Sequence, residues 1–154
     1  MREIEFRGIR KGGRDDGKWV YGLLFPRGIL IEPHYLEEYW IATGFENECY
    51  PVIPETIGQY TGLKDCKGNK IYEGDILRNP PKSDWEKINY VAFEVFWHDN
   101  DCADNHIGWQ IDRRHYYGCL AGGTSFEKFL PKYTSKMVII GNIHERPELL
   151  EEAQ

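Results

Sequence analysis

The sequence predicts a mainly β fold, a β-rich member of the α+β class, with a β-hairpin subdomain at the N-terminus and a small barrel or sandwich after it. Short segments that alternate apolar and polar residues recur along the chain between Gly, Pro and Asn turns. The C-terminal half shows no sustained 3.6-residue periodicity of the kind that amphipathic helices have. The aromatic content of 14% also favours strands, because aromatic side chains pack well on a pleated surface.

Length, charge and cysteine usage narrow the class of protein. A chain of 154 residues suits one domain or two small subdomains that share a core. The net charge of -6 opposes whole-molecule affinity for nucleic acid, since phosphate contacts need Lys and Arg. We expect a cytoplasmic protein without membrane contact, because the sequence has no signal peptide and no apolar run of about 18 residues. The four cysteines form no C-x-x-C pair, which is typical of free thiols in a reducing compartment.

Two strands joined by a tight turn are predicted at the N-terminus. In "EIEFR", apolar Ile4 and Phe6 alternate with charged residues. In "KWVYGLLF", one period-2 register holds Val20 and Leu24 and the other holds Trp19, Tyr21, Leu23 and Phe25. The intervening "KGGRDDGK" supplies glycines and an Asp-Gly pair, which adopt the positive φ that hairpin turns need.

The segment from 28 to 56 fits more than one structure. "GILIEP" is typical of a short strand that Pro33 ends, while "HYLEEYWIATG" fits a helical turn or a strand, and we favour a strand over Trp40–Thr43. "PVIPET" is restricted to extended geometry by its prolines and predicts a connector. We therefore expect an N-terminal hairpin and extended subdomain over residues 1–58 and a barrel subdomain over 59–154, together forming one compact unit.

The second subdomain is predicted to open with a hairpin. Gly68-Asn69 lies between apolar Leu63 and Ile71, the pattern of a hairpin turn. "ILR" predicts a short strand and "PPKSDWEK" a surface loop, and the segments "NYVAFEVFW", "GWQID" and "KMVIIGNI" predict three further strands. A short helix is expected to begin at Pro147.

The best metal candidate in the sequence is a polar loop, "HDNDCADNH"; a zinc site made by the four scattered cysteines is a much less favoured one. His98, Asp101 and His106 could converge on a divalent ion, because imidazole and carboxylate groups are common metal ligands. The spacing matches no established motif, and exposed loops collect the same residue types, so a solvated loop is the alternative that we favour. We expect no cofactor.

A second candidate is the acidic set of Asp65, Glu73 and Asp75. Two of these carboxylates could act as general acid and base if they faced each other across a hairpin. The alternative is that they brace turns, and we prefer it, because no nucleophile or base accompanies them in the sequence. We predict no catalytic residues and therefore a protein that is not an enzyme.

Two surfaces could bind partners. A protein-interaction surface would comprise Tyr60, Asp65, Tyr72, Glu73, Asp75, Trp97 and Trp109. A nucleic-acid surface would comprise Arg7, Arg10, Lys11, Arg14, Arg113 and Arg114, with aromatic stacking. The alternatives are a solvated basic face and tryptophans that belong to the core.

Three ordered motifs resemble the YopX family, small proteins encoded by bacteriophages and prophages. They are the opening "MREIEFRGIRKGGRDDGKWVYG", the central "PETIGQYTGLKDCKGNKIYEGDIL" and the closing "VIIGNIHERPELL". Cys66 and His144 depart from residues common in the family, which puts nothing important in doubt. The resemblance implies an SH3-like barrel in the second half, self-association, and no established enzymatic activity.

The resemblance and the missing catalytic set together favour one function. We expect a non-catalytic protein-interaction or self-assembling module of a phage or prophage, acting in the cytoplasm of the host bacterial cell. Its partner would be another copy of the chain, or a phage or host protein. The alternatives are a nucleic-acid-binding barrel protein, which is not favoured, and a metal-dependent hydrolase, which is less favoured still.

Overall fold

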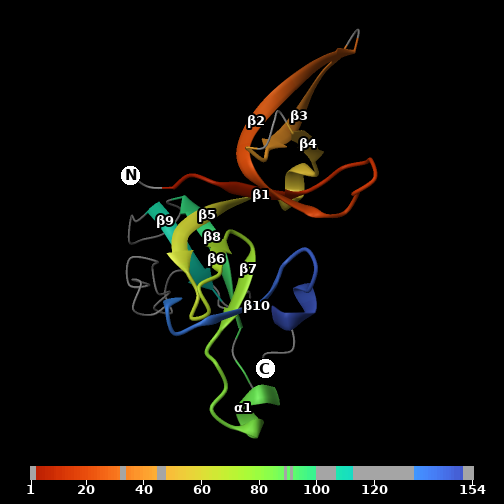
Figure 1. The fold of residues 1–154 in the computed structure, drawn as a ribbon. Helices are drawn as coiled ribbons and strands as arrows, with labels where there is room; N and C mark the ends of the chain where they lie inside the picture. The colour runs from red at the N-terminus through yellow and green to blue at the C-terminus, as the bar shows by residue number, and fades with distance from the viewer. Residues whose placement is uncertain are drawn as a thin grey trace. The chain divides into compact units, whose positions relative to one another are not determined.

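The computed structural model describes residues 3–31, 34–44, 48–88, 90, 92–99, 107–112 and 134–150. In these ranges the chain is mainly β, with antiparallel strands, one short α-helix and two 3-10 helices (Figure 1). The chain divides into two compact units, with the boundary after Tyr60. The sequence predicts this boundary two residues earlier, after residue 58. None of the helices in the described part is long and apolar enough to cross a membrane.

The first unit is an antiparallel sheet. Its strands are β1 (Phe6–Ile9), β2 (Trp19–Ile31), β3 (His34–Ala42), β4 (Cys49–Val52) and the start of β5 (Gly58–Lys64), in the spatial order β4-β3-β2-β1-β5. A 3-10 helix, Pro54–Thr56, leads into β5. The predicted N-terminal hairpin is confirmed, because β1 pairs with β2.

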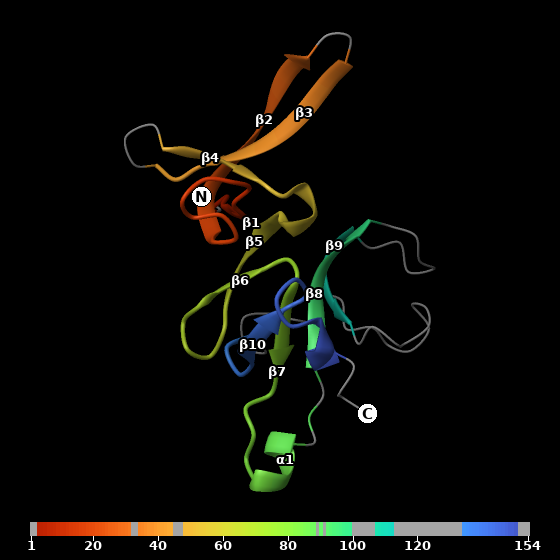
Figure 2. The ribbon, with the colours of Figure 1, turned by 90° about the vertical axis from the view of Figure 1, so that its right-hand side faces the viewer.

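Strand β2 differs from the prediction in its length. The sequence predicts separate strands before and after Pro26, but β2 passes through this residue, which pairs with Tyr39 of β3. The segment left open between helix and strand is the strand β3. Figures 1 and 2 show β2 and β3 running on together past the other strands of this unit, as a two-stranded ribbon.

One face of this sheet carries the core of the first unit. Val20, Ile41 and Val52 are buried there, and partly buried Phe6 and Leu24 pack against them. The segment after β1 also meets β4, because Lys11 N–H donates to Pro51 O at 2.9 Å and Ile53 N–H donates to Ile9 O at 2.9 Å. These bonds hold β4 against β1, so the sheet curls around its own core.

The second unit contains a hairpin and a four-stranded sheet. The hairpin joins the end of β5 to β6 (Lys70–Tyr72), as the sequence predicts. The sheet has the order β10-β7-β8-β9, formed by β7 (Asp75–Arg78), β8 (Ala92–Asp99), β9 (Ile107–Asp112) and β10 (Val138–Asn142). The short helix expected at Pro147 is the 3-10 helix Pro147–Leu150. The described strands form open antiparallel sheets, so an SH3-like barrel stays a prediction.

The surface loop predicted around residues 80–87 contains a helix instead. Helix α1 (Asp84–Ile88) begins after Ser83, whose Oγ accepts a bond of 3.2 Å from Glu86 N–H. The Glu86 carboxylate in turn accepts a bond from Lys82 N–H. The first bond satisfies one of the free N–H groups at the helix start, and the second ties the preceding residue to the same turn, so both favour a helix here although it is short.

Two clusters form the core of the second unit. One gathers around fully buried Ile71, Leu77 and Val95. The other gathers around Ile76 and includes Leu149 from the C-terminal 3-10 helix. Since consecutive residues of β7 enter different clusters, this strand is covered on both faces.

Candidate functional site

Asp65, in the turn between β5 and β6, has a structural role. Asp65 is only 4% exposed, and its carboxylate accepts bonds from Lys67 N–H at 2.9 Å, Asn69 N–H at 2.8 Å and the Asn69 amide at 3.1 Å. It also accepts a bond of 3.3 Å from Ile139 N–H in β10. The neighbouring Cys66 N–H donates to Met137 O at 2.8 Å. The turn between β5 and β6 is therefore tied to the edge strand β10.

These bonds set the charge of Asp65. Burial alone would raise the pKa of the carboxyl, but the hydrogen bonds from Asn69, Ile139 and Lys67 favour the carboxylate and leave the pKa below its ordinary value of 3.8. A carboxylate whose oxygens are occupied by four donors is poorly suited to exchange protons with a substrate.

The other two residues of the acidic set lie at the next turn, between β6 and β7. Asp75 is 2% exposed and accepts a bond of 2.8 Å from Tyr72 N–H. Gly74, with φ of 79°, donates its N–H to Val95 O at 2.7 Å and accepts from Ile143 N–H at 2.9 Å. Glu73 is partly exposed. The "YEGD" stretch thus reverses the chain and fastens it to its neighbours.

The predicted interaction surface is largely buried within its own chain. Tyr60, Asp65, Tyr72, Asp75 and Trp109 are all buried, so they offer little side-chain surface to a partner. Trp97 is 44% exposed and meets Trp109 edge to face, with ring centroids 5.1 Å apart across β8 and β9. Only Trp97 and Glu73 of that set present appreciable surface.

The predicted basic surface is also partly used inside the chain. Arg7 is buried with its guanidinium 4.7 Å from the Trp19 ring centre. Arg10 stacks 3.7 Å from the Tyr50 ring centre and pairs with Asp15 at 3.0 Å. Lys11 and Arg14 are exposed, and Arg113 and Arg114 lie outside the described residues.

The predicted metal site falls mostly outside the description. Asp101 and His106 lie outside the described residues, and His98 is placed only as part of the backbone of β8. In the described ranges, no three His, Cys, Asp or Glu side chains come together in a way that could hold a metal ion.

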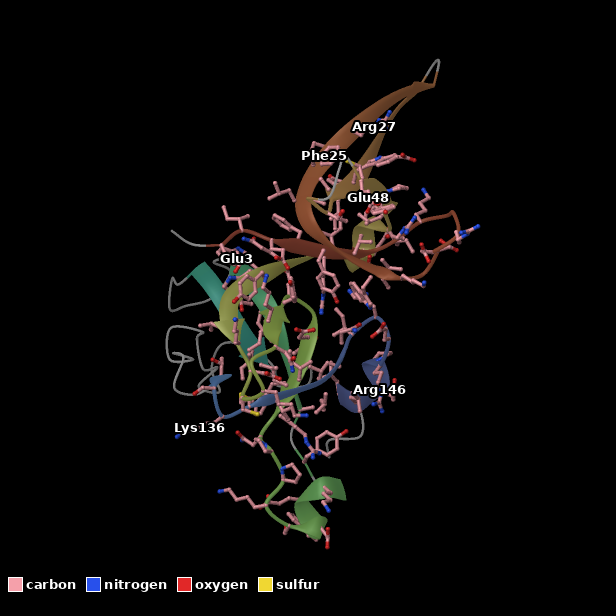
Figure 3. All side chains as sticks on the ribbon, viewed as in Figure 1. Glu3, Phe25, Arg27, Glu48, Lys136 and Arg146 are labelled. Atoms are coloured by element: carbon pink, nitrogen blue, oxygen red, sulfur yellow. The ribbon has the colours of Figure 1, made fainter. Side chains whose placement is uncertain are left out.

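A different surface combines exposed apolar side chains with fixed charges. It is the side of the β2–β3 ribbon opposite the core of the first unit, and we call it the outer face. It consists of Tyr21, Leu23, Phe25 and Arg27 of β2 with Glu38, Trp40 and Ala42 of β3. Leu23 is 61% exposed and Tyr21 46% exposed. Figure 3 labels Phe25 and Arg27 on this ribbon.

Trp40 organises the charged end of the outer face. The Arg27 guanidinium lies 4.8 Å from the Trp40 ring centre, a cation–π distance. The Trp40 indole N–H donates to Glu38 Oε2 at 3.3 Å. Arg27 and Glu38 are direct neighbours across the two strands. One guanidinium and one carboxylate are therefore held side by side next to apolar surface.

The sequence contains a pattern that could have predicted the outer face, although the interaction surface predicted above does not include it. Both alternating registers of "KWVYGLLF" are apolar. A sheet with one core buries only one of them, so the other must reach the surface or meet a partner. The structure puts Val20 and Leu24 toward the core and leaves Tyr21 and Leu23 exposed.

In the described residues the chain is thus a β-rich protein of two units, each built from antiparallel strands, and the first unit presents aromatic side chains on one sheet face. A sequence model of the family described as YopX protein matches residues 31–151. The chain therefore belongs to the YopX family, as its three motifs predict. A crystal structure of protein EF1440 from Enterococcus faecalis is similar, with a TM-score of 0.49 and 22% identity, covering 97% of this chain and 99% of that chain. No curated protein matches the sequence.

Proposed function

We propose that the protein is a non-catalytic protein-interaction module of a phage or prophage, acting in the host cytoplasm through the outer face. The exposure of Leu23 and Tyr21 is the observation that carries this proposal. Soluble proteins seldom leave adjacent large apolar side chains in water, and exposed apolar patches mark binding sites. Aromatic residues and Arg, both present here, are also enriched at the centres of interfaces.

The hydrogen bonds of the acidic set support the proposal that the protein is non-catalytic. Asp65 and Asp75 are buried and accept bonds from the backbone of their own chain, which leaves them little capacity for acid-base chemistry. The engagement of Arg7 and Arg10 with aromatic rings likewise makes nucleic-acid binding the less favoured alternative. An SH3-like barrel in the second unit and self-association are proposed from the family resemblance.

Cross-linking from the outer face tests this function. A photoreactive phenylalanine analogue in place of Leu23 should give a discrete adduct on irradiation of the expressing bacterial host. The same analogue in place of exposed Lys136, in the second unit and labelled in Figure 3, should give much less. We expect a clear excess of adduct from position 23, measured by immunoblot and identified by mass spectrometry.

The mass of the adduct identifies the kind of partner. Twice the mass of the chain indicates a second copy, and any other mass indicates a different protein. Equal yields from the two positions, or no adduct from position 23, would contradict the proposed function.

A further inference from the structure

We infer that an open edge of β3 binds an extended, basic segment of another protein, which adds to the sheet as a further strand. This inference rests on the proposed function and names the chemistry of the partner. The edge is the stretch His34–Glu38, which lies between the tip of the β2–β3 ribbon and the part of β3 that pairs with β4. We call this stretch the β3 edge.

Strand β4 covers only part of β3. It pairs with Tyr39–Ala42, and its last residue, Val52, lies opposite Tyr39. The chain then turns away, because Ile53 N–H donates to Ile9 O at 2.9 Å. Beyond this point β3 continues along β2, and no described residue pairs with it on its other side (Figure 2). The backbone N–H and C=O groups on that side can therefore form a ladder with an added strand.

The neighbouring edges of the first unit are protected. The outer side of β4 is covered by the segment after β1, since Lys11 N–H donates to Pro51 O at 2.9 Å and Arg10 forms a bridge with Val52. The outer side of β2, beyond the residues that pair with β1, carries Pro26, which has no N–H to donate. The β3 edge contains no proline. It is therefore the better template for a continuous ladder.

The ribbon gains stability from a further strand. Along the β3 edge the described sheet has β2 and β3 alone, and two-stranded antiparallel pairs are marginally stable in water. Three strands form a more stable sheet. A segment that adds to the β3 edge continues the sheet beyond the end of β4, and its main-chain hydrogen bonds supply affinity without a deep pocket.

The charges of the β3 edge select a basic segment. Glu37 and Glu38 are adjacent there. On the β2 side Glu38 pairs with Arg27, but Glu37 pairs with Gly28, which offers neither a side chain nor a charge. Opposite charges directly across two strands attract, and like charges repel. An added strand therefore gains most when Lys or Arg lies opposite Glu37, and the net charge of -6 favours the same partner at longer range.

Three peptides test the chemistry of this partner by NMR titration of the full chain. The probe is the peptide "TVTKRTVT", in which strand-forming residues flank a basic pair. It should bind about tenfold or more tightly than "TVTEETVT", which carries an acidic pair instead. The probe methylated on the backbone nitrogens of its four central residues keeps its charges but loses those donors, so it should bind at least about tenfold more weakly than the unmethylated probe.

Hydrogen exchange shows where the probe binds. Successive N–H groups of a strand point to opposite sides, so alternate amides of His34–Glu38 face the open side. Their exchange should slow about tenfold or more when "TVTKRTVT" is bound, while exchange in the β5–β6 hairpin stays unchanged. A peptide that covered the outer face without joining the sheet would not protect alternate amides of β3.

A charge reversal on the chain completes the test. Glu37→Lys should weaken binding of "TVTKRTVT" about tenfold and strengthen binding of "TVTEETVT" by a similar factor. Glu55→Lys makes the same change of charge at an exposed position of the 3-10 helix Pro54–Thr56 and should alter neither affinity. Circular dichroism checks that both variants fold, and the comparison of peptides on the unchanged chain stands without them.

Three results would each overturn the inference: equal binding of the acidic and basic peptides, undiminished binding of the methylated probe, or no slowing of exchange along the β3 edge. A discrete cross-link from position 23 would in that case still uphold the proposed function, because it reports contact with the outer face and not with the β3 edge.

Discussion

Replacing Asp65 by alanine should destabilise the second unit by about 3 kcal/mol, because the substitution leaves buried N–H groups without an acceptor. The donors that lose their bond are Lys67 N–H, both Asn69 groups and Ile139 N–H. Chemical denaturation at pH 7 measures the change in free energy. Hydrogen exchange should accelerate most in the turn around residues 65–69 and at the start of β10.

Two comparisons separate this role from a general effect of charge. Asp65→Asn keeps one acceptor oxygen but replaces the other with a donor amide, so its effect should be intermediate. Asp84→Ala removes an exposed carboxylate that pairs with Lys87 at 2.6 Å, and it should change stability by less than about 0.5 kcal/mol. An Asp65 variant as stable as the unchanged chain would show that the turn does not need the carboxylate.

The stabilisation by Asp65 should depend on pH in a defined direction. Hydrogen bonds lower the pKa of this carboxyl in the folded chain, outweighing the opposite effect of burial. A lowered folded pKa gives stability that is fully present above the unfolded value, about 3.8, and that is lost as the pH falls through the folded pKa. The difference in stability between the unchanged chain and Asp65→Ala should therefore shrink below about pH 4.

Gly22→Ala should destabilise the first unit by about 3 kcal/mol, because a Cβ at this position would overlap the Ala42 carbonyl oxygen. Gly22 lies where β2 stops pairing with β1 and begins to pair with β3. The substitution should push these strands apart and speed hydrogen exchange in β2 and β3. It should also weaken any binding by the outer face, since Leu23 and Ala42 are the next residues of the ribbon.

A second glycine supplies the control for Gly22. Gly12 has a φ of 78° and no atom within 4 Å of the position that a Cβ would occupy. Gly12→Ala therefore adds backbone strain of about 1 kcal/mol without any overlap. If both substitutions cost the same, the close approach of Gly22 to Ala42 has no energetic importance.

Much of the fold could be predicted, because turn chemistry is local. Gly68-Asn69 marks the β5–β6 hairpin, and Pro147 marks the start of the last helix. The preference for a bracing role at Asp65 also agrees with its hydrogen bonds. The family could be identified from the sequence for a related reason, since its central motif is the turn that this carboxylate organises.

The sequence does not predict the full length of β2, helix α1 or the outer face. The first and the last of these depend on which strand edges and sheet faces are covered. The sequence predicts two separate strands, "KWVYGLLF" and "GILIEP", but β2 runs through Pro26 between them. Pro is tolerated where a strand edge is free, and β1 pairs with β2 only as far as Gly22. Helix α1 is too short for periodicity to reveal, although the S-x-x-E pattern of Ser83 and Glu86 is its signal. Period-2 patterning also cannot say which apolar face of β2 stays exposed, so the outer face emerges only from the structure.

Oxidative footprinting tests the central claim most directly, because it reports which side chains are covered when the partner is present. Hydroxyl radicals would label the protein once in dilute purified form and once in extract of the host cell, with modified residues quantified by mass spectrometry. We predict that Tyr21 and Leu23 are modified more slowly in the extract, while Trp85, which is 69% exposed, is modified equally fast in both. Undiminished labelling of Tyr21 and Leu23 together with protection of Trp85 would contradict the account.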